Sequence, residues 1–318
     1  MRRRTLLGLG GAAGVAAAAG LPAWFGYRRA MAAARQRIAR PTNATMTRFG
    51  AMQWAEAGHG TPVLMLHGTG GGFDQGLLFA RRLSAAGWRI VAPSRFGYLG
   101  SDFPDDPSPA NQADALADLL DALGIDRVSV IGGSAGAISA IEFAIRHPGR
   151  CHALVALVPA TYAPDRPPMR PNATGAAIMR HALQSDFLFW LGITLSKDAM
   201  TATLLATDPA LVRAAPLEEQ ARARAILQGI LPVSERIQGL LNDAEQAGNP
   251  APQALDMIEA RTLAISLQDD RFLTLDAARH IAKSVRGAKL ASYPTGGHIW
   301  IGHDAEIFAE IDRFLRAA

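Results

Sequence analysis

The sequence predicts an α/β protein with a mostly parallel central sheet flanked by helices. Short continuous apolar runs alternate along the chain with segments that have the spacing of amphipathic helices. A strand that is buried on both faces of a parallel sheet has such a run, bounded by turn-forming residues. With 318 residues, of which 49% are apolar, the chain can bury the core that this arrangement needs.

The predicted elements follow one another in chain order. Residues 46–57 have a strand-like composition and predict one or two edge strands. Residues 110–123 predict an amphipathic helix, because their apolar residues recur every three or four positions with acidic residues between them. Buried strands are expected at 62–67, 88–92, 127–131, 153–158, 262–266 and 289–293, and further helices at 75–86, 135–146, 273–285 and 304–315.

The alternation is interrupted between residues 160 and 256. This stretch has no run typical of a buried strand, carries nine prolines and contains several helix-like pieces. Because a structureless connection of this length is improbable in a compact domain, we expect residues 161–256 to form a helical cap. The core would then consist of residues 41–160 and 257–318. The aromatic cluster at 187–190 either packs the cap on the core or lines an apolar pocket.

Charge and cysteine content exclude several classes of function. The formal net charge of +4 is unevenly divided, because residues 1–55 contain nine arginines and no acidic residue. The remainder holds 23 basic against 28 acidic residues, a net charge of −5, which removes the electrostatic basis for nucleic-acid binding. The single cysteine, Cys151, excludes an internal disulfide and any multi-cysteine metal site. We expect no metal and no organic cofactor, and a small molecule as the partner.

The first 40 residues predict an export signal or membrane anchor followed by a spacer. Three arginines precede an uncharged run rich in Ala and Gly at 5–27, which is the pattern of a secretory signal. Residues 3–7 resemble a twin-arginine export signal, and small residues near 17–19 and 30–32 offer cleavage sites. The run is also long enough to cross a bilayer, so an uncleaved membrane anchor is an alternative. A cytosolic N-terminal helix is a third interpretation.

The strongest chemical motif is Gly132-Gly133-Ser134-Ala135-Gly136, which joins a predicted buried strand to a predicted helix. A chain that turns this sharply from strand to helix holds its central serine in a strained conformation with the hydroxyl exposed. Gly132 and Gly136 allow close backbone approach, and the helix N-terminus favours negative charge on the reacting oxygen. We expect Ser134 to be a nucleophile. The alternative is a small-residue turn that only packs the helix on the sheet.

A serine nucleophile needs a neighbouring base, and a carboxylate that orients the base. Of the eight histidines, His298 alone directly follows the last predicted strand, where a Gly-rich turn can bring its imidazole to the carboxyl ends of the strands. Asp269 and Asp270 follow the strand at 262–266 and therefore come to the same edge of the sheet. One of these two is expected to be the acid, and Asp165 is a weaker candidate.

The Gly-rich loop His67-Gly68-Thr69-Gly70-Gly71-Gly72 follows the first buried strand and can direct backbone N–H groups at a developing oxyanion. The expected donors are the N–H groups of Thr69 and Ala135, and His67 is expected to shape the loop. A phosphate-binding loop fits the sequence less well, because the Gly-Lys-Ser/Thr ending of a P-loop is absent.

Together these motifs resemble those of the α/β-hydrolase superfamily, in its branch with a helical lid. The resemblance covers about residues 45–318. The sequence departs from the family at Ser94, where aspartate is usual, and at Leu267 and Thr274, where the acid turn usually has glycine and proline. The resembling segments are His67-Gly68 (oxyanion loop), Gly132 to Gly136 (nucleophile elbow), Ser94 to Ser101 (a loop near the site), Gln268 to Phe272 (acid turn) and Gly296-Gly297-His298 (histidine loop).

The resemblance implies an α/β-hydrolase fold, a hydrolase activity, and Asp270 rather than Asp269 as the partner of His298. A serine at the nucleophile position argues against the haloalkane dehalogenase and epoxide hydrolase branches. We therefore expect an exported serine hydrolase that attacks an ester or related acyl bond of a small apolar substrate through Ser134, His298 and Asp270. The alternatives are hydrolysis of a carbon–carbon bond in a diketone-type ring-cleavage product, and a non-catalytic binding protein with this fold.

Overall fold

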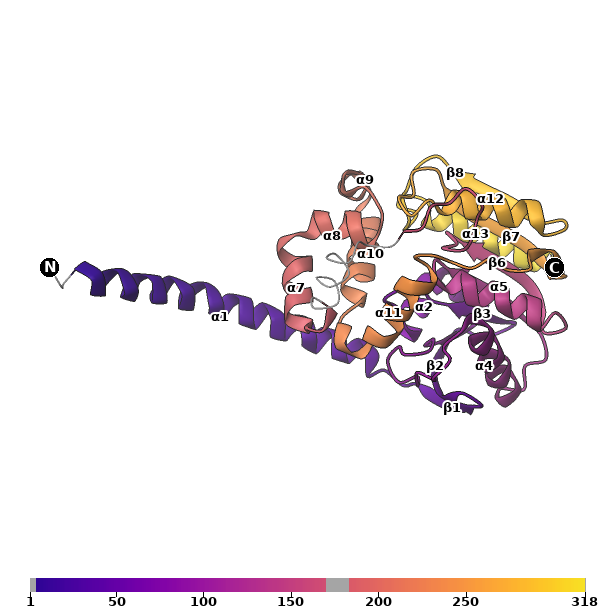
Figure 1. The fold of residues 1–318 in the computed structure, drawn as a ribbon, viewed down its shortest axis with the longest axis horizontal. Helices are drawn as coiled ribbons and strands as arrows, with labels where there is room; N and C mark the ends of the chain where they lie inside the picture. Colours follow the sequence, from indigo (N-terminus) through magenta and orange to yellow (C-terminus); the bar gives the residue numbers. More distant parts are fainter. Residues whose placement is uncertain (1–3, 170–182, 318) are drawn as a thin grey trace.

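The computed structural model describes residues 4–169 and 183–317, with side chains from residue 21 onward. Its centre is an eight-stranded sheet with the order β1-β2-β4-β3-β5-β6-β7-β8 (Figure 1). The β1–β2 and β2–β4 pairs are antiparallel, and the five remaining pairs are parallel. The prediction of an α/β protein with a mostly parallel sheet is therefore confirmed.

The strands lie close to the predicted apolar runs. Of the two N-terminal strands, only β1 lies at the edge of the sheet, because β2 pairs with both β1 and β4. The strands are β1 (Asn43–Thr47), β2 (Gly50–Ala57), β3 (Pro62–Leu66), β4 (Arg89–Pro93), β5 (Val128–Gly133), β6 (Cys151–Leu157), β7 (Arg261–Leu267) and β8 (Lys289–Tyr293).

Helices cover both faces of the sheet, because successive side chains of a strand point to opposite faces. In β3, Val63 and Met65 belong to one buried apolar cluster, whereas Leu64 and Leu66 belong to the other. The single helix predicted at 75–86 is divided into two, which meet at Ala80. On the face of Val63 lie α2 (Phe73–Phe79), α3 (Arg81–Ala85) and α13 (Asp304–Arg316), and on the face of Leu64 lie α4 (Pro109–Ala122), α5 (Gly136–Arg146) and α12 (Thr274–Ser284).

The connection from β6 to β7, which we call the insert, is helical and has no strand among its described residues. Residues 170–182, which the predicted cap includes, lie outside the described part. Two buried ion pairs fix the insert to the core: Asp243 with Arg95, and Arg236 with Asp74. Its helices are α7 (Asp186–Leu195), α8 (Lys197–Leu204), α9 (Pro209–Ala214), α10 (Leu217–Gly229), η1 (Val233–Glu235), α11 (Ile237–Gln246) and η2 (Leu255–Met257).

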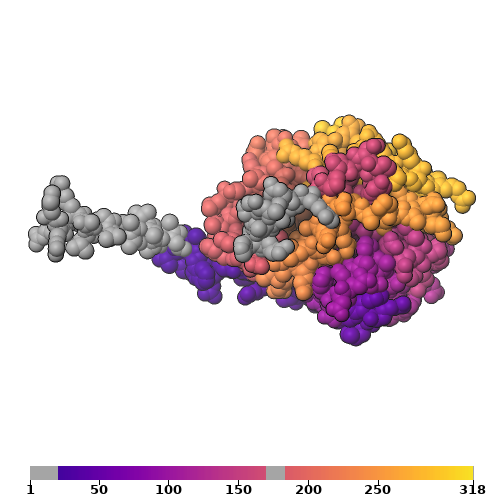
Figure 2. All heavy atoms as spheres, viewed as in Figure 1, coloured from indigo at the N-terminus to yellow at the C-terminus, as the bar shows by residue number. Residues whose placement is uncertain are grey.

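The N-terminal helix α1 (Arg4–Ile38) projects from the molecule (Figure 1), and its C-terminal part lies against the insert (Figure 2). Met31 and Ala34 are buried in the same apolar cluster as Val63. Within the part of the chain whose side chains are described, no helix is long and apolar enough to cross a membrane. Arg3, and the side chains of residues 4–20 that make up most of the predicted signal, lie outside that part.

Candidate active site

Ser134 occupies the sharp turn between β5 and α5. Its φ of +53° lies in the left-handed region that residues other than glycine rarely adopt. The surrounding backbone holds this conformation, because the N–H of Ser134 donates to the carbonyl of Leu157 at 2.9 Å and its carbonyl accepts from the N–H of Ala137 at 3.0 Å. The side chain is half-buried. Backbone strain at such a position is typical of functional residues.

The glycines on either side of Ser134 are required by close packing rather than by an unusual φ. A Cβ on Gly132 would lie 2.6 Å from the Cα of Ala137. A Cβ on Gly136 would lie 2.5 Å from the carbonyl oxygen of His67 at the end of β3. Any larger side chain would therefore push α5 away from the sheet and displace Ser134.

Three side chains from distant parts of the sequence form one hydrogen-bonded line. His298 Nε2 lies 2.8 Å from Ser134 Oγ, and His298 Nδ1 lies 2.8 Å from Asp270 Oδ2. A carboxylate only accepts, so Nδ1 carries the proton and Nε2 is left to accept from the hydroxyl of Ser134. The imidazole of His298 is nearly buried and the side chain of Asp270 is completely buried. The line therefore lies largely out of water, with Ser134 at its outer end.

Asp270 remains ionised in spite of its burial. Burial by itself would raise the pKa of this carboxyl group, but the electrostatic attraction of the adjacent His298 imidazole and the hydrogen bonds that the carboxylate accepts hold the pKa below its usual value. The hydrogen bonds come from His298, from the hydroxyl of Thr274 and from the N–H of Phe272. Thr274, the residue that departs from the usual proline, thus supports the carboxylate that orients the imidazole.

The other two candidate acids lie elsewhere. Asp269 accepts from the N–H groups of Gly296 and Gly297 at 3.1 and 2.9 Å, so it holds the loop before His298 rather than its imidazole. Asp165 is exposed on the loop that follows β6. The geometry places Asp270 beside His298, as the acid turn implied.

The predicted oxyanion loop lies directly against Ser134. A Cβ on Gly68 would be 3.1 Å from the Cβ of Ser134. The N–H of Gly68 donates to Oε1 of Gln75 at 2.9 Å and is therefore occupied. By contrast, the N–H groups of Thr69 and Ala135 donate to no group of the described chain. Both remain available to a developing oxyanion at Ser134.

His67 is a buried, neutral support for this loop. Its Nε2 accepts from the N–H of Arg95 at 3.0 Å, so the ring proton is on Nδ1, which donates to the carbonyl of Gly68 at 2.7 Å. Burial and the adjacent charge of Arg95 place the pKa of His67 well below its usual value. Arg95 is paired in turn with Asp243 of the insert, at 2.8 Å.

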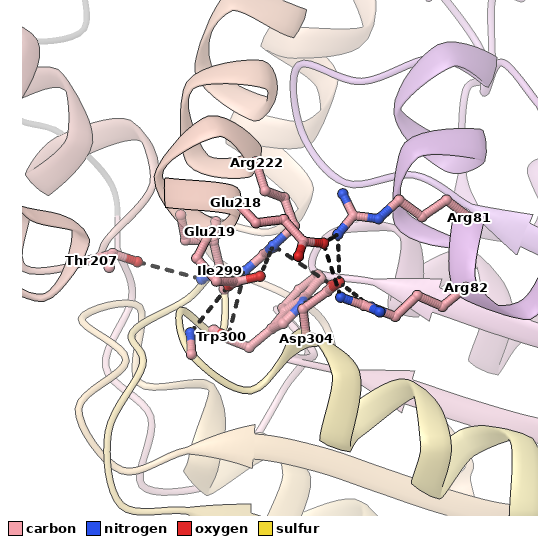
Figure 3. A network of polar contacts seen from close by, with 10 residues as sticks. Arg81, Arg82, Thr207, Glu218, Glu219, Arg222, Ile299, Trp300 and Asp304 are labelled. Atoms are coloured by element: carbon pink, nitrogen blue, oxygen red, sulfur yellow. Dashed lines mark hydrogen bonds and ion pairs between the residues drawn. The ribbon is translucent and has the colours of Figure 1, made fainter. Parts of the chain in front are cut away.

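The loop after His298 is held by side chains that the sequence did not single out (Figure 3). Arg222 of α10 donates to the carbonyl of Ile299 at 2.7 Å and pairs with Glu219 at the same distance. Glu219 also accepts from the N–H of Gly302. Only the folding of the insert onto this loop brings these residues near His298. The network continues through Arg81, Arg82, Thr207, Glu218, Trp300 and Asp304.

The aromatic cluster of the insert lies partly in the apolar core. Phe189 and Trp190 of the aromatic cluster are buried, and Trp190 packs on Tyr27 of α1, so this part of the cluster has a packing role.

Among the described residues, no three His, Cys, Asp or Glu side chains come together in a way that could hold a metal ion.

A family model described as "alpha/beta hydrolase fold" matches residues 61–302, which span every segment of this site. The chain belongs to the α/β-hydrolase family. The resemblance inferred from the motifs is thereby confirmed, and this α/β-hydrolase is an enzyme of the hydrolase class.

Several hydrolases are similar to this chain over most of their own length. The chain is 27% identical to 2-hydroxy-6-oxo-6-phenylhexa-2,4-dienoate hydrolase of Burkholderia cepacia, over 76% of this chain and 83% of the relative. It is 28% identical to 2-hydroxy-6-oxononadienedioate/2-hydroxy-6-oxononatrienedioate hydrolase of Paraburkholderia xenovorans, over 78% and 84%. Among solved structures, an α/β-hydrolase fold protein of Nakamurella multipartita superposes with a TM-score of 0.66 and 27% identity, over 87% of this chain and 99% of that protein.

Proposed function

We propose that this α/β-hydrolase is a serine esterase that cleaves an ester, or a related acyl bond, of a small apolar substrate. The observation that carries the proposal is the line Ser134–His298–Asp270, with 2.8 Å at each of its two contacts. A serine hydroxyl is a weak nucleophile by itself, and a neutral imidazole held in one tautomer by a buried carboxylate activates it.

The proposed reaction has two halves. Ser134 Oγ attacks the carbonyl carbon while His298 Nε2 takes the hydroxyl proton, and the N–H groups of Thr69 and Ala135 stabilise the oxyanion. Collapse of this intermediate breaks the ester bond, and His298 returns the proton to the leaving alcohol. Water then attacks the acyl-enzyme with His298 again as the base, which releases the acid and restores Ser134. Asp270 stabilises the imidazolium that forms in each half.

The second candidate is cleavage of a carbon–carbon bond beside a ketone in a dienoate. The relatives from Burkholderia and Paraburkholderia named above favour this candidate. An arginine beside the site also favours this candidate, because a dienoate carries a carboxylate that a guanidinium group can bind. Arg166 is half-buried, donates to the carbonyls of Phe272 and Thr161, and forms no ion pair within the described chain. Phe272 in turn packs on the ring of His298, at 4.8 Å between centroids.

Substrate preference is tested by comparing kcat/KM for p-nitrophenyl esters and for 2-hydroxy-6-oxo-dienoates, with Ser134→Ala as the control. We expect ester hydrolysis that Ser134→Ala abolishes, with little change in melting temperature. A larger kcat/KM for the dienoates would overturn the esterase proposal in favour of the second candidate. In that case Arg166→Gln should raise KM for the dienoate and leave KM for a neutral ester unchanged. Ester hydrolysis that survives in Ser134→Ala would refute both.

A further inference from the structure

We propose that exposed apolar side chains of α1 and α7 form a surface that docks on an anionic lipid bilayer. We call this surface the α1–α7 face. The inference does not depend on the bond that the enzyme cleaves. The face consists of Leu21, Trp24 and Phe25 from α1 and Phe187, Leu188 and Leu195 from α7.

These side chains are unusually exposed for their size. Of the twelve large apolar side chains that are exposed in the described chain, six belong to these two helices. Phe25 is 67% exposed and Leu195 is 74% exposed. Single exposed apolar residues are common, but several on adjoining helices mark a site of contact with another molecule or a membrane.

The two helices are held together as one rigid surface. Tyr27 of α1 packs on Phe187 and Trp190 of α7, with ring centroids 5.3 and 5.8 Å apart. Further along α1, the burial of Met31 and the ion pair of Arg37 with the buried Asp74 attach the helix to the core. The exposed side chains of α1 therefore keep a fixed position beside those of α7.

The chemistry around the face fits a lipid surface with negative charge. Arg28 and Arg29 directly follow the uncharged run at 5–27, and both are exposed. Arginines beside an apolar segment attract anionic headgroups. Trp24 and Tyr27 lie at the boundary between the apolar run and these arginines, which is where aromatic side chains are favoured at a membrane interface.

The proposal requires that α1 stay attached to the mature enzyme. Cleavage near residues 30–32 would remove Leu21, Trp24 and Phe25, and it would also remove Tyr27 from its place against Phe187. The packing of α1 therefore favours the anchor over a signal that is cleaved at that point.

A fluorescent label at single cysteines tests the face in the full chain. The native Cys151 is buried, and burial raises its pKa to about 12, so the thiol is protected from labelling. The test variant is Leu195→Cys. The matched control is Met46→Cys, because Met46 is 76% exposed, slightly more than Leu195, and lies on the edge strand β1 far from α7 (Figure 1). Both are labelled with the environment-sensitive fluorophore NBD and reconstituted into vesicles of phosphatidylcholine and phosphatidylglycerol, with or without doxyl-labelled phosphatidylcholine.

We expect blue-shifted emission from the label at 195, and quenching of this emission by about half or more with doxyl lipid, as for a group at the headgroup–acyl boundary. The label at 46 should show neither effect. Vesicles of phosphatidylcholine alone should reduce the quenching at 195. Two outcomes would overturn the proposal: no quenching at 195, or equal quenching at 46. If the emission at 195 is blue-shifted but not quenched, protein such as a second copy of the chain covers the face instead of lipid.

Discussion

At the scale of single residues, the neighbouring carboxylates of Asp269 and Asp270 have different partners. Asp270 accepts from the imidazole of His298, and Asp269 accepts from two backbone N–H groups of the turn before it. Both contacts orient His298, but only Asp270 touches the ring. The adjacency of the two acids does not by itself separate these roles. The resemblance of the acid turn implied Asp270, and the hydrogen bonds give each carboxylate its own partner.

Asparagine substitutions separate the two acids in a measurable way. Asp270→Asn should lower kcat by about four orders of magnitude, the loss found when the carboxylate of such a triad becomes an amide and the imidazole takes the wrong tautomer. Asp269→Asn keeps an oxygen acceptor for the turn and should cost much less. Steady-state kinetics on the best ester, with thermal melting as the folding control, provide the measurement. A larger loss in the Asp269 variant would contradict the assignment.

The buried His67 predicts a pH dependence of stability. Its pKa in the folded protein is well below the usual 6.5, so between these two values the unfolded chain binds a proton that the folded chain does not. The contribution of neutral His67 to the free energy of unfolding is complete above pH 6.5. It is lost as the pH falls towards the pKa that His67 has in the folded protein. Because of His67, we expect the free energy of unfolding to fall by up to about 1.4 kcal/mol for each pH unit below 6.5.

Denaturant unfolding at several pH values tests the dependence. His67→Gln should flatten the slope just below pH 6.5, even if the variant is less stable overall. His59→Gln, at an exposed position, is the matched control and should leave the slope as it is. An unchanged slope in His67→Gln would assign the pH dependence to other groups.

At the scale of elements, α1 acts as a structural part of the enzyme. Arg37 and Arg236 share the buried carboxylate of Asp74, at 2.9 Å each. Burial alone would raise the pKa of Asp74, but the two guanidinium groups hold it below its usual value. Asp74 lies in the first turn of α2, which follows the Gly-rich loop, and the carbonyl of Gly71 in that loop also accepts from Arg236. The N-terminal helix, the insert and the oxyanion loop are therefore linked at one carboxylate.

Removal of one guanidinium tests this link. Arg37→Ala should lower the free energy of unfolding by about 2 kcal/mol, because the buried Asp74 loses a charged partner and the carbonyl of Gly229 loses a donor. Arg35→Ala, an exposed arginine of the same helix, should change it by less than about 0.5 kcal/mol. Urea unfolding of both variants gives the two values, and equal losses would mean that the contact with Asp74 contributes nothing specific.

At the scale of the whole molecule, one apolar cluster joins the three parts of the chain. Met31 of α1, Trp190 and Leu227 of the insert, and Val63 and Ile265 of the sheet all belong to it. The insert therefore has no separate core of its own among the described residues. We expect the insert and the sheet to unfold together.

Urea unfolding followed by two probes tests this cooperativity. Tryptophan fluorescence and far-UV circular dichroism should give one transition with the same midpoint. A chain that lacks residues 1–40 should show a lower midpoint, because the sites of Met31 and Ala34 are opened to water. An early fluorescence transition in the full chain, without loss of the sheet, would show that the insert unfolds independently.

The sequence by itself determined the α/β class, the alternation of strands and helices, and the turns that carry Ser134 and His298. These features are encoded by contiguous residues, whose apolar period and glycine positions act locally. Only the tertiary structure decided that Asp269 holds the turn before His298, that Arg222 supports the loop after His298, and that α1 packs into the core. Such contacts join side chains far apart in the chain, and their geometry depends on how complete elements pack, which no local pattern specifies.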